Sequence, residues 1–437
     1  VDKTLYIEKL FSLGTVFFLS RPHRFGKSLF LSTLRAYFEG KKELFEGLYI
    51  AEREDEIARG QKREPWAASP VLYFDLNAKD YESRDTLLRR LMAQLLEVEK
   101  RYDVENGGED PEDRFIYLIK ALYEKTGKQV VILVDEYDKP LLETVDDEVL
   151  NKEIRSLLKA FYEVLKQCDE YIRFAFLTGI TKFSKTTLFS GVNNLIDITL
   201  LDDYAAICGF TEAELDQFAP EVEQLAKQNK STVEKTRARL KKEYDGYCFA
   251  EDGVHVYNPY SLLKVLATSK YKHYWFENAT PSYLVNYLKR TQVFMPDLET
   301  DLKLDESAIQ DFRYNDDDSV IPLLFQSGYL TIKKYSPRTQ LFLLGYPNEE
   351  VRFCFETLLL RAFFSNRKPL TGNEGLILKQ EIVRGNVEGF MDKIHTLLAA
   401  LPYPTNANMD TVEWTYQSLF YLLFRLMGQH VRTEEHS

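Results

Sequence analysis

Four short apolar runs constrain the fold of this 437-residue chain more than any other feature. They are "TVFFLS" (15–20), "PVLYFDL" (70–76), "KQVVILVDEYD" (128–138) and "IRFAFLTG" (172–179), and segments with helical spacing of apolar residues separate them. A strand with a continuous apolar run is buried on both faces, and alternation with helices is typical of a parallel sheet. Residues 1–210 therefore predict an α/β domain with helices on both faces of the sheet.

The sequence changes character after residue 210. Thr211 and Glu214 have the spacing of a capping box, and a charged helical stretch follows to about Lys242. Residues 327–347 predict a β-hairpin around a Ser-Pro turn, and helices ahead of such a hairpin indicate a winged-helix type of domain. We predict three parts, which are the α/β domain at 1–210, a helical and winged-helix lid at 211–347, and a helical region at 348–437.

Composition excludes several classes of protein. A net charge of −12 argues against a surface devoted to non-specific phosphate contacts. The four cysteines form no CxxC pair, so neither a disulfide framework nor a zinc site is expected. No leader peptide is visible, and the apolar run at 418–428 is too short to span a bilayer and carries Arg425. We expect a cytoplasmic protein that makes no membrane contact.

The stretch "FFLSRPHRFGKSLFLSTL" (17–34) predicts a phosphate-binding loop between a strand and a helix. Gly26 lets the backbone approach phosphates, Lys27 can reach the outer phosphates, and the Ser28 hydroxyl can ligate magnesium. Arg24 and Phe25 complete the turn, and Arg24 adds positive charge. A Gly-Lys-Ser triplet also occurs by chance, but the position between a buried strand and an amphipathic helix is the one that phosphate binding requires.

Asp135 and Glu136 end the strand predicted at 128–138. An acid at the carboxyl end of a neighbouring parallel strand can hold magnesium, directly or through water, which we predict for Asp135. The next acid, Glu136, can orient or deprotonate an attacking water. Strand ends are often acidic simply because loops are wet. Together with the loop, in the right chain order, the acids nevertheless predict binding of ATP and Mg²⁺.

Several motifs in order resemble the bacterial and archaeal AAA-ATPase-like family. They are "DKTLYIEKL", "FFLSRPHRFGKSLFLSTLRAYF", "VVILVDEYDKPL", "FAFLTGITKFSKTTLFSGVNNL" and "YDGYCF…VYNPYSLL". The resemblance covers most of the chain and implies an AAA-type P-loop fold, in which "RP-x-RFGK[ST]" is the form of the phosphate loop. It also implies that Arg21-Pro22 in place of the usual first glycine is a family variant, with proline fixing the turn while Arg21 or Arg24 supplies charge.

The resemblance also implies a set of site residues. The expected catalytic residues are Glu136, Lys27 and Asp135. The expected magnesium ligands are Ser28 and Asp135. The expected nucleotide contacts are made by Arg21, Pro22, His23, Arg24, Phe25, Gly26, Lys27, Ser28, Leu29, Thr178 and Asn193. Thr178 is marked as a sensor of the γ-phosphate. Ser190, Asn193 and Asn194 either line the same pocket or a subunit contact, or are ordinary loop residues. Arg155 and Arg173 are candidates for an arginine finger by location, although surface ion pairing is the expected use of each.

Members of this family commonly continue into a PD-(D/E)XK nuclease-like domain. Residues 412–437 resemble the beginning of that domain, so we expect a truncated C-terminal segment. The one Glu-x-Lys of the chain, Glu39-Gly40-Lys41, falls at a predicted helix end rather than on a strand, so we expect no nuclease activity. Basic residues in 227–242 and in the hairpin offer a nucleic-acid face, but a solvated helix face interleaved with acids is the favoured interpretation.

The sequence therefore predicts a magnesium-dependent ATP-binding protein and ATPase. We expect it to act as a nucleotide switch for an attached or partner nucleic-acid-processing module. The alternative is a non-hydrolysing, nucleotide-regulated module that binds DNA or protein. A P-loop kinase of small molecules is the weaker hypothesis, since no second acceptor pocket is legible. A homo-oligomer stays open.

Overall fold

The computed structural model describes residues 1–77, 81–105, 107–183, 188–275, 284, 302–310, 320–363, 374–399, 409–428 and 431. The chain divides into two compact units. The first unit comprises Val1–Ala219, Cys248–Pro259 and Ser307–Gly328, and the second comprises Pro220–Tyr247, Tyr260–Glu306 and Tyr329–Ser437. Among the helices that these residues form, none combines the length and the apolarity needed to cross a membrane.

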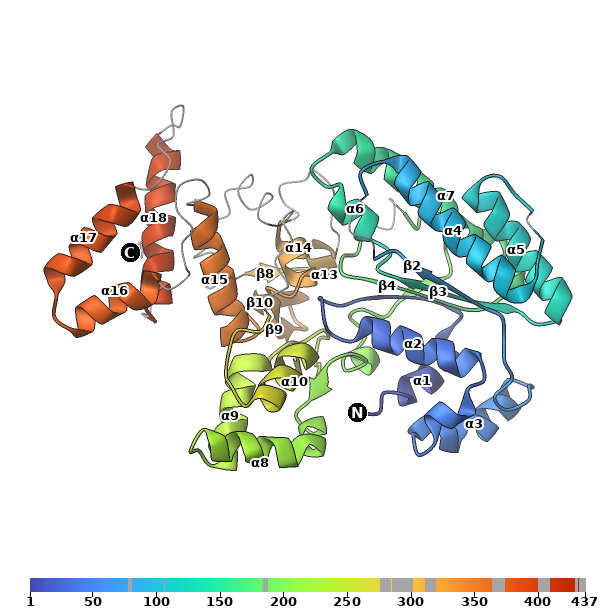
Figure 1. Ribbon diagram of the computed structural model, residues 1–437, viewed down its shortest axis with the longest axis horizontal. Coiled ribbons are helices and arrows are strands. Elements are labelled where there is room, and N and C mark those ends of the chain that lie inside the picture. The colour runs from blue at the N-terminus through green and yellow to red at the C-terminus, as the bar shows by residue number, and fades with distance from the viewer. Residues whose placement is uncertain are drawn as a thin grey trace. The chain divides into compact units, whose positions relative to one another are not determined.

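Five parallel strands form the centre of the first unit (Figure 1). They are β1 (Val16–Ser20), β2 (Val71–Asp75), β3 (Val130–Asp135), β4 (Ile172–Gly179) and β5 (Leu195–Asp197). Their order across the sheet is β2-β3-β4-β1-β5, and every neighbouring pair is parallel. The four strands predicted from apolar runs are confirmed, whereas β5 was not predicted.

Helices cover both faces of this sheet, as predicted (Figure 1). One face carries α4 (Arg84–Tyr102), α5 (Pro111–Thr126) and α7 (Glu148–Gln167), and the other carries α1 (Leu5–Leu13), α2 (Lys27–Phe38) and α3 (Tyr49–Gly60). Aromatic rings fill both layers. Phe161 of α7 stacks on Phe115 with ring centroids 4.7 Å apart, and Phe38 of α2 packs on Phe174 of β4 at 4.9 Å.

The first unit is completed by short elements. They are η1 (Lys42–Phe45), α6 (Lys139–Glu143), η2 (Asp169–Tyr171), η3 (Asp202–Tyr204), β6 (Phe210–Thr211), η4 (Glu214–Phe218), β7 (Val256–Tyr257), α13 (Glu306–Gln310) and α14 (Val320–Gln326). The predicted capping box is confirmed, since Thr211 N donates to Glu214 Oε2 at 2.8 Å and Glu214 N donates to Thr211 Oγ1 at 3.2 Å. The pair spans the turn that leads into the 3₁₀ helix η4, and the α-helix begins only at Ala219.

The second unit contains helices and a small antiparallel sheet. Its elements are α8 (Ala219–Gln228), α9 (Val233–Tyr244), α10 (Pro259–Thr268), β8 (Lys303–Leu304), β9 (Thr331–Ser336), β10 (Leu341–Gly345), α15 (Glu349–Phe363), α16 (Glu374–Val383), α17 (Val387–Ala399) and α18 (Met409–Leu426). The hairpin predicted at 327–347 is confirmed as β9 and β10. The predicted helix to Lys242 is interrupted, since Lys230 has a left-handed backbone and Thr232 caps a new helix.

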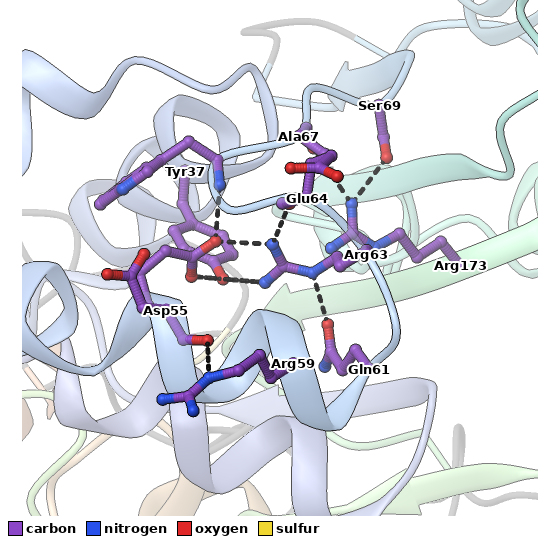
Figure 2. A network of polar contacts seen from close by, with 11 residues as sticks. Tyr37, Asp55, Arg59, Gln61, Arg63, Glu64, Ala67, Ser69 and Arg173 are labelled. Carbon is purple, nitrogen blue, oxygen red and sulfur yellow. Dashed lines mark hydrogen bonds and ion pairs between the residues drawn. The ribbon is translucent and has the colours of Figure 1, made fainter.

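A buried ion pair fastens the segment between α3 and β2 (Figure 2). Glu54 of α3 is fully buried, and its Oε1 accepts from Arg63 Nη1 at 2.6 Å and from Trp66 N at 2.7 Å. Its Oε2 accepts from the Tyr37 hydroxyl of α2 at 2.5 Å. Nearby, Arg173 of β4 donates to Ser69 Oγ at 2.8 Å. The Glu54 carboxylate thus links Arg63 and Trp66, which lie between α3 and β2, to Tyr37 of α2.

We expect Glu54→Gln to lower the free energy of unfolding by about 2–4 kcal/mol, because it leaves the Arg63 charge partly buried without its partner. Glu56→Gln on the same helix is the matched control. Glu56 pairs with Arg53 but its side chain is 63% exposed, so a loss below about 1 kcal/mol is expected. Urea unfolding of both variants measures the difference, and equal losses would contradict this assignment.

The Glu54 effect should also depend on pH. Burial alone raises the pKa of Glu54, but hydrogen bonds from Arg63, Tyr37 and Trp66 N outweigh it and hold the pKa below the ordinary 4.5. A carboxyl with a lowered folded-state pKa stabilises the fold above its unfolded pKa and loses that contribution as pH falls. The gap between wild type and Glu54→Gln should therefore be full near pH 7 and narrow below about pH 4.5.

Candidate functional site

Parallel alignment brings the predicted loop and the predicted acids to one edge of the sheet. The loop at 21–26 follows β1, Glu136 follows β3, and β4 lies between these two strands. The carboxyl ends of parallel strands meet at the same edge, which is where open α/β sheets bind ligands. Two hydrogen bonds tie both segments to the end of β4: Arg21 N donates to Gly179 O at 3.2 Å, and Tyr137 N donates to Thr178 O at 3.0 Å.

The loop turns through left-handed backbone into α2. Arg24 has φ 66° and Gly26 has φ 96°, and α2 begins at the next residue, Lys27. A Cβ on Gly26 would meet no atom within 4 Å, so the glycine is required by its backbone angle and not by crowding. The first turn of α2 leaves backbone N–H groups without helical partners, and these favour an anion.

Lys27 lies at the centre of this edge. Its side chain is 3% exposed, and Nζ donates to Arg21 O at 2.9 Å and to Pro22 O at 3.2 Å. The same ammonium is 3.8 Å from Glu136 Oε1. The structure therefore brings the predicted loop lysine and the predicted catalytic acid together.

Ser28 and Asp135 also meet. Ser28 lies beside the Asp135 carboxylate, whose Oδ2 accepts from the Tyr73 hydroxyl at 3.3 Å. Burial raises the pKa of Asp135 and the Glu136 charge adds to this, which outweighs the lowering by the nearby Ser28 hydroxyl and the Lys27 charge. The other oxygen, Oδ1, is buried and has no hydrogen-bond partner among the described residues.

Ser28 and Asp135 suit a magnesium ion that also binds water and phosphate oxygens, and they do not suit a metal ion that needs protein ligands only. The described residues contain no group of three or more His, Cys, Asp or Glu side chains that could hold a metal ion. Mg²⁺ needs fewer, since it is usually held by one or two protein oxygens together with waters and phosphate oxygens. A hydroxyl beside a carboxylate with one unpartnered oxygen provides that donor set.

Glu136 has a strained backbone. Its φ of 52° is in the left-handed region, which costs a non-glycine residue on the order of 1–3 kcal/mol. Its Oε2 is buried and accepts no hydrogen bond within the described part of the chain, while Oε1 faces Lys27. Strain of this kind persists only where the flanking structure imposes it.

Arg21 is buried at the base of the loop. Its Nη1 donates to Ser20 O at 2.9 Å and to Thr199 O at 2.8 Å, and its Nη2 donates to Tyr204 O at 3.0 Å. The guanidinium also lies over the Phe249 ring, 4.3 Å from its centroid, and burial lowers the pKa of Arg21 to about 10. Nη1 and Nη2 of Arg21 thus donate to carbonyl oxygens, while Nε is buried without a hydrogen-bond partner among the described residues.

The remaining predicted loop residues differ in exposure. Pro22 and Phe25 are buried, whereas Leu29 is 72% exposed on the first turn of α2. Burial lowers the pKa of His23 to about 3, so this imidazole is neutral at pH 7. Thr178 is buried in β4, and its hydroxyl donates to Leu19 O of β1 at 2.9 Å.

Asn193 lies at the opposite end of the strands from the loop, where β1 and β5 begin. It precedes β5, which runs parallel to β1 from the pair Val16 and Leu195, so the start of β5 is beside the start of β1. The neighbouring Asn194 donates to Asp169, just before β4 begins. The structure does not bring Asn193 together with the loop, because the loop follows the opposite end of β1.

The two candidate arginine fingers make local contacts. Arg173 starts β4 and donates to Ser69 Oγ while lying over the Phe38 ring at 5.1 Å, so its use is not the surface ion pair that we expected. Arg155 of α7 donates to Asn151 Oδ1 at 2.7 Å. Glu39-Gly40-Lys41 lies at the end of α2, as predicted, where Lys41 pairs with Glu39 at 2.6 Å.

Comparison with known proteins gives the family. The family described as "Predicted AAA-ATPase" matches residues 1–189. A curated relative, "Uncharacterized protein in vnfD 5'region" from Azotobacter chroococcum mcd 1, is 35% identical over 450 residues, which is 100% of this chain and 81% of the relative. The chain belongs to the AAA-ATPase-like family. Nucleotide binding is the activity that membership implies.

Among solved structures, the chain is similar to "Structure of the Aeropyrum Pernix ORC2 protein (ADPNP-ADP complexes)". That likeness has 11% sequence identity and a TM-score of 0.29, and it covers 79% of this chain and 87% of that one. At such a TM-score it carries no argument about this member of the AAA-ATPase-like family.

Sequence reasoning missed three features of the site. The carbonyls of Thr199 and Tyr204 that hold Arg21 come from far along the chain, and no local pattern marks them. Tyr73, whose hydroxyl reaches Asp135, lies in the middle of the strand predicted at 70–76. Asp138 was visible as the last acid of "DEYD" but received no role.

We expect Arg21→Lys to cost about 2–3 kcal/mol of folding free energy in the absence of nucleotide. A lysine keeps the charge but cannot donate to three carbonyls as the planar guanidinium does, so buried acceptors lose their partners. Arg59→Lys is the control, because Arg59 is exposed and donates only to Asp55 O of its own helix among the hydrogen bonds of the described residues. If urea unfolding shows Arg21→Lys within about 0.5 kcal/mol of wild type, charge alone is what the position needs.

Proposed function

We propose that this member of the AAA-ATPase-like family binds ATP with Mg²⁺ and hydrolyses it. The observation that carries the proposal is the convergence of Lys27, Ser28, Asp135 and Glu136 at one edge of the sheet. A helix N-terminus, a lysine, a hydroxyl next to a carboxylate, and a second acid are the parts that phosphoryl transfer to water requires.

Each residue has a distinct role in this proposal. The N–H groups at the start of α2 hold the phosphates, and Lys27 donates to their outer oxygens. Ser28 and Asp135 would hold magnesium, which when bound neutralises charge on the phosphate oxygens. Glu136 orients a water against the γ-phosphorus and accepts its proton, while the bond from that phosphorus to the bridging oxygen of ADP breaks.

Lys27 links binding to activation of the acid. Its ammonium faces Glu136 at 3.8 Å and donates to two loop carbonyls. Phosphate oxygens compete for the same donors, so ATP draws Lys27 away from Glu136. The acid is then left to bind the attacking water.

We expect Lys27→Ala to weaken ATP binding at least tenfold, because it removes the buried cation that faces the phosphates. Glu136→Gln should bind ATP within about threefold of wild type but hydrolyse it about 100- to 10,000-fold more slowly, since the base is lost and the shape is kept. Calorimetry with Mg²⁺ measures binding, and phosphate release measures turnover.

The controls are Lys41→Ala and Glu143→Gln. Lys41 pairs with Glu39 at the far end of α2, and Glu143 pairs with Lys139 on α6. Both variants should bind and turn over ATP as wild type does. Unchanged hydrolysis in Glu136→Gln would contradict the catalytic assignment and favour the non-hydrolysing binding module.

We further infer that turnover acts as a switch for an attached or partner nucleic-acid-processing module. Support comes from the sequence resemblance and from the exposed basic residues Lys333, Lys334 and Arg338 on the hairpin of β9 and β10. A homo-oligomer, a cytoplasmic location and a winged-helix character for residues 211–347 stay predictions from the sequence.

A further inference from the structure

We propose that Asp138 is a positioning residue for hydrolysis, which holds Glu136 in its strained backbone conformation by tying the segment after β3 to the segment after β4. The inference rests on the proposed catalytic role of Glu136. It concerns a residue two positions further along, on the same turn.

Asp138 is fully buried, and one of its oxygens collects three donors. Oδ2 accepts from Ile180 N at 3.0 Å, from Thr181 N at 2.6 Å and from Thr181 Oγ1 at 2.6 Å. All three donors come from the two residues that follow β4 directly. A single side chain thus fixes the turn after β3 to the exit of the neighbouring strand.

Gly179 provides the space for this arrangement. A Cβ at residue 179 would lie 2.3 Å from Asp138 Oδ1 and 2.6 Å from Tyr137 Cδ1, closer than any real Cβ contact. The last residue of β4 therefore lacks a side chain where the carboxylate of Asp138 lies. Gly179 and the Asp138 carboxylate therefore depend on each other, because a larger residue at 179 would collide with the carboxylate.

Tyr137 reinforces the same junction. Its N–H donates to Thr178 O at 3.0 Å, its hydroxyl donates to Thr181 O at 2.8 Å, and the same hydroxyl accepts from Phe183 N at 3.3 Å. Residues 137 and 138 therefore form hydrogen bonds with four residues of the segment 178–183. Glu136, immediately before them, carries the left-handed φ of 52°.

The segment after β4 is itself anchored, so it can impose a conformation. Lys182 pairs with Asp197 of β5 at 2.6 Å, and its N–H donates to Gln326 Oε1 of α14 at 2.8 Å. Hydrogen bonds from both sides leave residues 180–182 little freedom. Glu136 is then aligned by two flanks: β3 before it and the Asp138 junction after it.

Electrostatics argue against Asp138 as a mere filler of the core. The pKa of Asp138 is raised to about 6, because burial and the nearby Glu136 charge outweigh the Thr181 hydrogen bonds and the Lys27 charge. A buried ionisable carboxyl beside a second acid is costly to maintain. Its benefit is the strength of three hydrogen bonds to one charged oxygen at this junction.

Asp138→Asn tests the proposal, because it keeps the side chain's size and weakens the charge-assisted bonds. We expect kcat for ATP to fall at least tenfold, while the Kd for ATP stays within about twofold. A merely structural role would weaken binding together with turnover. Asp147→Asn is the control, since Asp147 caps α7 with a hydrogen bond from Leu150 N at 3.0 Å on an exposed surface; its kcat should match wild type.

A double variant identifies the residue through which Asp138 acts. If Asp138 works by positioning Glu136, the Asp138→Asn/Glu136→Gln double variant should hydrolyse ATP no more slowly than Glu136→Gln alone in single-turnover measurements. Multiplied losses would overturn the proposal, as would wild-type kcat in Asp138→Asn.

Thr181 gives an independent readout if Asp138→Asn folds poorly. Thr181→Val removes one donor to Asp138 and should lower kcat severalfold, whereas Thr181→Ser retains the hydroxyl and should restore it. Equal rates in the two Thr181 variants would count against the proposal. If Glu136→Gln hydrolyses ATP as fast as wild type, the proposed function and this inference fail together. If Glu136→Gln is slow while Asp138→Asn and Thr181→Val are unimpaired, only the inference fails.

Discussion

The end of β4 supports both halves of the site. The phosphate loop after β1 and the acids after β3 never need to touch each other's backbone, because both are hydrogen-bonded to residues 178 and 179. Arg21 N reaches Gly179 O from one side, and Tyr137 N reaches Thr178 O from the other. The separation between the backbones of the two segments is therefore set by the one strand between them, with about 4.8 Å to each neighbour. A strand order without β4 at the centre would lose that common support.

Around this support, charges are buried with polar partners instead of being left to solvent. Lys27 donates to loop carbonyls, Arg21 donates to the carbonyls of Thr199 and Tyr204, and Asp138 accepts from N–H and hydroxyl groups after β4. Such groups cost energy to bury, and they repay it as a preorganised field at the position of the reacting phosphate. Among the described residues, Asp135 Oδ1, Glu136 Oε2, Asp138 Oδ1 and Arg21 Nε are nevertheless buried without a hydrogen-bond partner. The first two belong to the residues that we propose to hold metal and water, which is where incomplete hydrogen bonding is expected to occur.

The sequence predicted most of the sheet and half of the site for one reason: those parts are local. A continuous apolar run marks a buried strand, and strand, loop and helix in succession mark the loop with Gly26, Lys27 and Ser28. β5 escaped prediction because it has only three residues and all of them are half-buried. The position of Asn193 away from the loop could not be foreseen for the same reason, since only the direction of β5 reveals at which end of the strands Asn193 lies. Arg21, whose partners lie at 199 and 204, depends on tertiary contacts that no spacing encodes.

The absence of the usual first glycine can now be explained by support from outside the loop. A glycine at that position relieves crowding by having no side chain, but it contributes nothing to hold the turn. Arginine does the opposite: its side chain leaves the loop, stacks on Phe249 and binds three carbonyls, so the turn is fixed by packing beneath it. The left-handed angles that remain are carried by Arg24 and Gly26, next to the helix. The loop therefore keeps its left-handed turn at Arg24 and Gly26, beside α2. At the end of β1 it is held by the buried Arg21 side chain and not by a flexible glycine.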